Sequence, residues 1–156
     1  RLLARLQSLG LPVPAPVAAR YVRGALTYTA DLITEFLHDT ISLAKAMTSS
    51  QVHEAVWHSV GRTIASFHAQ GVHHADLNAH NVMLRLPPSH SELEPGRHSP
   101  DVFLLDFDRG QIREPGEWEA EVLQRFRRSL EKVSRVAGQV FEDRCWLWEM
   151  EGYGEH

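Results

Sequence analysis

The chain has few of the residues that mark several common classes of protein. Its 156 residues include a single cysteine, Cys145, which excludes an internal disulfide framework and agrees with a reducing compartment. No apolar run is long enough to span a membrane, so we expect no transmembrane segment. The formal charge of -4 offers no overall attraction to nucleic acid, and we expect no nucleic-acid partner.

Two catalytic classes also lack their signatures. No G-x-S-x-G elbow occurs, so a serine hydrolase is poorly supported. His73, His74 and His80 lie close together, but the chain has neither H-E-x-x-H nor paired C-x-x-C, which makes a zinc site a weak hypothesis. With 43% hydrophobic residues, the chain can still bury the core of one domain.

The most informative motif present is His74-Ala75-Asp76-Leu77-Asn78-Ala79-His80-Asn81. It matches the catalytic-loop pattern H-R-D-L-x-x-x-N at every fixed position except the arginine. Further along the chain, Asp106-Phe107-Asp108 stands in the place of the metal-binding D-F-G. The two motifs in this order indicate a phosphoryl-transfer site.

Three side chains in these motifs have the chemistry that phosphoryl transfer needs. Asp76 is the candidate base, which would accept the proton of the attacking hydroxyl. Asn81 and Asp106 offer oxygen ligands suited to Mg²⁺. Taken singly, an Asp or Asn in a loop more often hydrogen-bonds its own backbone, and it is their combined spacing that favours the catalytic interpretation.

Periodicity predicts the elements around the motifs. Apolar residues recur at helical spacing in three segments and mark short strands in four others. The predicted helices are 2–9, 52–71 and 116–136, and the predicted strands are 18–23, 26–37, 82–86 and 102–105. A final amphipathic stretch carries Phe141, Trp146, Leu147 and Trp148, and we interpret its aromatic residues as core rather than as a ligand platform.

The sequence from Gly71 to Asn81, together with Leu105-Asp106-Phe107-Asp108-Arg109-Gly110, closely resembles the 3-deoxy-D-manno-octulosonic acid (Kdo) kinase family of lipopolysaccharide-core enzymes. The resemblance runs along most of the chain. It implies ATP-dependent phosphorylation, with Mg²⁺, of a Kdo hydroxyl on a lipid A precursor. It also implies a location in the cytoplasm, peripheral to the inner membrane. Another sugar of the core, such as heptose, remains an alternative acceptor.

The same resemblance implies an α+β, protein-kinase-like fold, mainly the helical C-lobe with a remnant of the N-lobe sheet. Residues 1–37 would be the end of the N-lobe, and residues 38–156 the C-lobe with the catalytic and metal-binding loops. The backbone around Glu35, Phe36 and Leu37 would bind adenine as the hinge. Asn78 would lie near the phosphate or the acceptor. The sequence does not predict an oligomeric state.

The kinase pattern is incomplete in this chain. It contains no G-x-G-x-x-G loop and no V-A-I-K-like lysine, and it begins at Arg1 rather than methionine. We therefore expect a fragment that lacks most of the N-lobe and is inactive alone. The alternative is a non-catalytic, kinase-like remnant that binds a partner or a nucleotide.

Three local features refine the prediction. Ala75 replaces the arginine that pairs with an activation-loop phosphate, so we expect no control by such phosphorylation. Asp108 replaces the glycine of D-F-G and would assist the metal or orient Arg109, unless it is a solvated turn residue. Basic residues gather on the late helix, which favours a phosphorylated lipid surface as a partner, although a solvated helix face is the commoner meaning of such a cluster. They are Arg125, Arg127, Arg128, Lys132 and Arg135.

Overall fold

The computed structural model describes residues 1–24, 27–49, 52–85 and 99–155, which form helices and three small antiparallel sheets. The helices are α1 (Leu2–Ser8), α2 (Leu43–Thr48), α3 (Glu54–Ala69), α4 (Trp118–Val136) and α5 (Asp143–Gly154). The strands are β1 (Pro16–Arg23), β2 (Tyr28–Thr34), β3 (Thr40–Ser42), β4 (Val72–His73), β5 (Val82–Arg85), β6 (Asp101–Leu104) and β7 (Gln111–Ile112). Small antiparallel sheets beside a helical body agree with the predicted α+β class.

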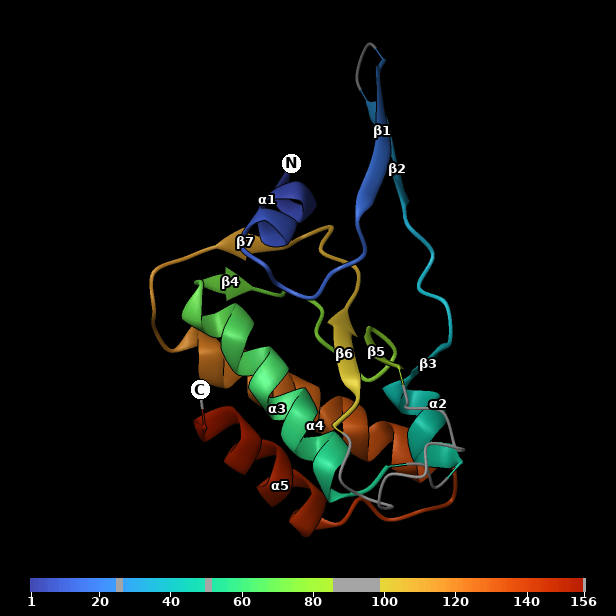
Figure 1. Cartoon of the computed structure of the whole chain (residues 1–156), viewed down its shortest axis with the longest axis vertical. Helices are drawn as coiled ribbons and strands as arrows, with labels where there is room; N and C mark the ends of the chain where they lie inside the picture. The colour runs from blue at the N-terminus through green and yellow to red at the C-terminus, as the bar shows by residue number, and fades with distance from the viewer. Residues whose placement is uncertain (25–26, 50–51, 86–98, 156) are drawn as a thin grey trace.

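Helices α3, α4 and α5 form a helical body below the β1–β2 hairpin (Figure 1), and with the neighbouring strands they supply most of the buried core. On α3 the predicted apolar positions are buried, because they recur every three or four residues and so share one face. They are Val56, Val60, Ile64 and Phe67. The predicted helix over 116–136 is confirmed as α4, and it buries Val122, Leu123, Phe126 and Leu130.

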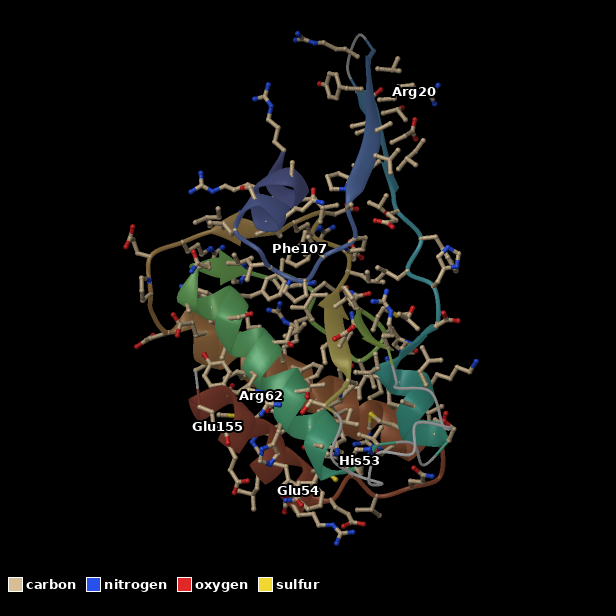
Figure 2. The ribbon with its side chains drawn as sticks, in the orientation of Figure 1. Arg20, His53, Glu54, Arg62, Phe107 and Glu155 are labelled. Carbon is tan, nitrogen blue, oxygen red and sulfur yellow. The ribbon has the colours of Figure 1, made fainter. Side chains whose placement is uncertain are left out.

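Helices α3 and α5 approach each other through glycines. A Cβ atom at Gly61 would lie 2.0 Å from the Glu149 carbonyl oxygen, and one at Gly152 would lie 2.2 Å from the His58 carbonyl oxygen. At the end of this contact, Arg62 and Glu155 form an ion pair of 3.0 Å (Figure 2). Only residues without a side chain permit this spacing between two helix backbones.

The aromatic residues of the final stretch pack against the core, as predicted. Phe141, Trp146 and Trp148 are partly buried there, whereas Leu147 is 59% exposed. The sequence did not predict the fully buried side chain of this helix, which is Glu149, at 0% exposure.

The hairpin of β1 and β2 projects away from the helical body (Figure 1). Its second strand is shorter than the predicted 26–37, because it ends at Thr34, and Leu26 lies outside the described residues. After Thr34, one more backbone hydrogen bond joins the Glu35 amide to the Ala15 carbonyl at 2.8 Å. The chain then leaves β1 and continues to β3, and the predicted domain boundary after residue 37 stays a prediction.

The central sheet has the order β3-β5-β6 and confirms the two predicted strands that flank the loop motifs. The prediction for 82–86 holds through Arg85, and Leu86 is outside the described residues. The second strand is Asp101–Leu104, one residue earlier than predicted. Within the described part of the chain, no helix combines the length and the apolar character needed to cross a membrane.

Candidate active site

The catalytic loop begins where α3 ends. Gly71 follows the helix with φ +68, the left-handed conformation that glycine adopts without a steric penalty. Its carbonyl accepts a hydrogen bond from the Arg113 amide at 2.8 Å, and a Cβ atom there would lie 2.3 Å from the Arg113 carbonyl oxygen. The following strand, β4, pairs with β7, so the backbone that leads into the catalytic loop is held by the segment that contains β7 and Arg113.

The main chain of Asp76 is held by three hydrogen bonds. Its amide donates to Nδ1 of His74 at 3.2 Å, and its carbonyl accepts from the side-chain amides of Asn78 and Asn81, both at 3.0 Å. The carboxylate makes no hydrogen bond or ion pair with any of the described residues, and Asp76 is exposed. The backbone is therefore fixed while the acidic group stays available to a substrate.

Antiparallel pairing brings Asn81 and Asp106 together. Val82 at the start of β5 pairs with Leu104 at the end of β6, so the residues just outside the two strands are neighbours. The Leu105 amide donates to the Asn81 carbonyl at 2.9 Å. Asp106 itself has φ 62, a conformation that is uncommon outside glycine and that often marks functional sites.

His74 links the catalytic loop to the Asp106 segment. Its Nε2 lies 2.7 Å from the Leu105 carbonyl, and its Nδ1 accepts the Asp76 amide, which requires the neutral Nε2–H tautomer. Burial lowers the pKa of His74, although the Leu105 carbonyl and the carboxylates of Asp106 and Asp76 oppose this. The imidazole therefore stays neutral and connects the candidate base with the candidate metal ligand.

Helix α4 supports the other side of the loop. The guanidinium of Arg125 donates to the Ala75 carbonyl, and the Ser129 hydroxyl accepts from the Ala79 amide at 3.0 Å. These two residues are four apart and share one face of α4. The sequence did not predict either role, because each contact joins residues 50 positions apart in the chain and no local pattern indicates it.

The predicted catalytic and metal-binding residues line one cavity of about 1120 Å³. Asp76, Asn78, Asn81 and Asp106 all line it, between α2, the catalytic loop and α4. Asp106 also lines a second cavity of about 600 Å³ on the side of the β1–β2 hairpin. The carboxylate of Asp106 thus lies where the two cavities meet.

The side chains of Asn78 and Asn81 differ in which amide atoms remain without a hydrogen-bond partner within the part of the chain that the structure describes. Asn78 uses both ends of its side chain, because Nδ2 donates to Asp76 and Oδ1 accepts from the His80 amide at 2.9 Å. Its predicted place near the phosphate or the acceptor stays a prediction. Asn81 donates through Nδ2 and has no partner for Oδ1 among the described residues, so this oxygen is available to a cation.

The donor set fits Mg²⁺. Asn81 Oδ1 and the Asp106 carboxylate are hard oxygen ligands, and Mg²⁺ is usually held by one or two carboxylates together with water and substrate phosphates. No group of three or more His, Cys, Asp or Glu side chains is placed to hold a metal ion within the described ranges. A site of two protein oxygens is consistent with a cation that enters together with its nucleotide.

The predicted hinge residues lie apart from this cavity. Glu35, Phe36 and Leu37 follow β2, and none of them lines the cavity of Asp76. The Glu35 amide donates to the Ala15 carbonyl, which leaves the Glu35 carbonyl as the backbone group of this residue that adenine could use. The Leu37 carbonyl accepts the Thr40 hydroxyl at 2.9 Å. The predicted binding of adenine to the backbone of Glu35, Phe36 and Leu37 stays a prediction.

Asp108 is separated from the catalytic cavity. It is exposed and lines the second cavity, and the structure shows no ion pair between it and Arg109. Between Asp106 and Asp108, the Phe107 ring stacks on Phe67 with centroids 5.5 Å apart (Figure 2 marks Phe107). This packing anchors the segment that carries Asp106.

The comparisons with known proteins agree with this geometry. The family model described as "Lipopolysaccharide kinase (Kdo/WaaP) family" matches residues 1–146. A 3-deoxy-D-manno-octulosonic acid kinase of Xylella fastidiosa (strain M23) is 39% identical over 148 residues, covering 92% of this chain and 53% of the relative. The relative from Haemophilus influenzae (strain PittEE), with the same description, is 36% identical over 154 residues, covering 97% and 60%.

A solved structure shares the fold. The chain titled "WaaP in complex with acyl carrier protein" superposes with a TM-score of 0.69 at 21% identity, covering 97% of this chain and 63% of that one. The present chain spans about half the length of the Xylella relatives that it matches.

Proposed function

The chain belongs to the lipopolysaccharide kinase (Kdo/WaaP) family, and on that premise we propose that it forms the catalytic part of an ATP-dependent kinase that phosphorylates a Kdo hydroxyl on a lipid A precursor. The observation that carries the proposal is the placement of Asp76. Its main chain is fixed by His74, Asn78 and Asn81, while its free carboxylate lines the same cavity as Asn81 and Asp106.

In the proposed reaction Asp76 accepts the proton of the acceptor hydroxyl. The hydroxyl oxygen then bonds to the γ-phosphorus of ATP as the bond from that phosphorus to the β-γ bridging oxygen breaks, which releases ADP. Asn81 and Asp106 would hold Mg²⁺, which neutralises phosphate charge when bound. His74 keeps both motifs in register, since its two nitrogens bind Asp76 and the residue before Asp106.

The remaining parts of the proposal follow from the same chemistry. Adenine would bind the backbone around Glu35, Phe36 and Leu37, and Asn78 would lie near the phosphate or the acceptor. Because ATP is cytoplasmic and the lipid acceptor is membrane-bound, we place the enzyme in the cytoplasm, peripheral to the inner membrane. A Kdo acceptor is favoured over heptose by the relatives that share 36–39% identity with this chain.

The test is Asp76→Asn in the complete gene product that contains this chain. Transfer of phosphate from ATP to Kdo-lipid A should fall about 10²- to 10⁴-fold, the usual contribution of a positioned base. Circular dichroism and the thermal midpoint should not change. The matched control is Asp31→Asn, an exposed hairpin residue that pairs only with Arg20 among the described residues and should leave turnover intact.

Three outcomes separate the alternatives. Near-normal turnover of Asp76→Asn would refute the assignment of the base. Mass spectrometry that finds the phosphate on heptose rather than on Kdo would change the acceptor. A folded wild-type protein that transfers no phosphate to either sugar would favour the non-catalytic remnant.

A further inference from the structure

The basic cluster predicted on the late helix is divided between two faces of α4. Arg127 points into ion pairs, with Nε 3.1 Å from Glu131 and a terminal nitrogen 2.7 Å from Asp143, and its guanidinium lies over the Trp146 ring. Its charge is therefore compensated on the side that faces α5. This residue cannot belong to a basic binding surface without losing both partners.

The other face of α4 lines the catalytic cavity. Arg128 and Lys132 are four residues apart and both border this cavity, together with Lys45 from α2, a helix in contact with α4. Within the described part of the chain, none of these three side chains has an acidic partner or a hydrogen bond. A cavity lined by three cations without acidic partners attracts anions.

The charges are ordered along the cavity. Its only acidic side chains among the described residues are Asp76 and Asp106, at the catalytic end. Arg125, which lines the same wall, already donates to Ala75 of the catalytic loop. Moving along α4 at about 1.5 Å per residue, Arg128 lies about 5 Å beyond Arg125, and Lys132 lies about 10 Å beyond it.

The wall becomes apolar after the cations. Val133, Val136 and Ala137 also line the cavity, and Val136 is 82% exposed. Along the cavity, the candidate base is therefore followed first by the cations and then by aliphatic side chains. An acceptor that presents a hydroxyl, an anionic group and an apolar part in that order would match it.

We propose that Lys45, Arg128 and Lys132 form an acceptor subsite that binds an anionic oxygen group, a carboxylate or a phosphate, on the sugar lipid whose hydroxyl reaches Asp76. The inference rests on the proposed function and names the residues that select its acceptor. Neutral acceptors would enter the same cavity without this contact, so the subsite discriminates through binding rather than through the chemical step.

The experiment compares Arg128→Gln, Lys132→Gln and the double variant in the complete gene product. Each substitution keeps a polar side chain and removes one charge. We expect KM for Kdo-lipid A to rise about 10- to 100-fold per charge, the range of a charge-assisted hydrogen bond, with kcat changed less than about twofold. Arg127→Gln is the matched control, because it removes the adjacent charge from the other face of α4.

Two further comparisons distinguish a carboxylate from a phosphate as the bound anion. If the carboxylate binds, free Kdo should bind wild type more tightly than Kdo methyl ester in a calorimetric titration, and the double variant should lose that difference. If a lipid phosphate binds, wild type should have a higher KM for the dephosphorylated lipid acceptor than for the phosphorylated one. The variants should not raise the KM for the dephosphorylated acceptor any further. Either result supports the subsite.

Two results would overturn the subsite. One is an unchanged KM in both single variants together with unchanged binding of free Kdo and inorganic phosphate. The other is an equal KM increase in Arg127→Gln, which would indicate a general loss of positive charge. A wild-type protein that binds free Kdo through these residues but transfers no phosphate would refute the proposed function and leave the subsite standing.

Discussion

Replacement of Glu149 by glutamine should make the stability of the chain much less dependent on pH. Glu149 is fully buried between α5 and α3, and neither carboxyl oxygen has a hydrogen-bond partner among the described residues. Burial in these surroundings raises its pKa from 4.5 to about 8. The folded chain therefore holds this proton at pH values where the unfolded chain has released it.

The sign of the effect follows from this proton. Because the folded state binds it more tightly, the stabilisation is complete below about pH 4.5 and is lost progressively as the pH rises to about 8. At about 1.4 kcal/mol per pH unit, the full interval corresponds to about 5 kcal/mol, an upper bound because the native state can relax around the charge. That is comparable to the total stability of a small domain.

The assay is urea unfolding followed by tryptophan fluorescence at pH 5, 6, 7, 8 and 9. At pH 5 wild type and Glu149→Gln should be similar, since both side chains are neutral. At pH 8 and above the variant should be more stable by several kcal/mol. The difference between the two proteins is the measured quantity, because His68, whose pKa burial lowers to about 4, gives both proteins an opposite slope below pH 6.5, and this slope cancels in the difference.

The control is Glu151→Gln on the same helix. Its carboxylate is 62% exposed and lies 3.4 Å from His58, so its removal should change stability by less than about 1 kcal/mol at any pH. A constant stability difference between wild type and Glu149→Gln from pH 5 to pH 9 would refute the reasoning. It would mean that Glu149 finds water or a partner in solution.

Two other predictions concern the loop and the helix contact. His74→Phe keeps a ring in the space beside Phe107 but removes the hydrogen bonds to Asp76 and Leu105, so kcat in the complete gene product should fall about 10- to 100-fold with little change in KM for ATP; an unchanged kcat would contradict the bridging role. Gly61→Ala should destabilise the chain by about 3 kcal/mol or more in chemical denaturation, because its Cβ would overlap the Glu149 carbonyl, whereas Gly154→Ala, with nothing within 4 Å, should be close to neutral; similar midpoints for the two variants would contradict the contact.

The part of the site that the sequence predicted is the part encoded locally. Asp76 and Asn81 belong to one loop, and the apolar run ending at Leu105 predicts a strand directly before Asp106. The antiparallel pairing of β5 with β6 was not predicted. It is this pairing that makes the start of one strand and the end of the other neighbours, and so brings Asn81 close to Asp106.

The missed features depend on contacts between distant segments. Arg125 and Ser129 looked like ordinary members of a charged helix, and only the docking of α4 against the loop gives them partners at Ala75 and Ala79. Glu149 was missed for a different reason. A glutamate beside tryptophans is expected at a surface, and here the close approach permitted by Gly61 and Gly152 places it inside.

Helix α4 also explains how the loop tolerates Ala75 in place of arginine. In the motif with arginine, that side chain supplies a cation that a phosphorylated activation loop can recruit. Here the cation comes from Arg125, whose guanidinium is bonded to the carbonyl of the substituted residue itself. The loop is therefore held by a contact within the folded body, which requires no phosphate, and the next turn of the same helix carries Arg128 to the cavity that Asp76 also lines. In the proposed kinase, support of the base and selection of the acceptor would thus arise from adjacent turns of one helix, which would couple the position of the bound sugar to that of Asp76.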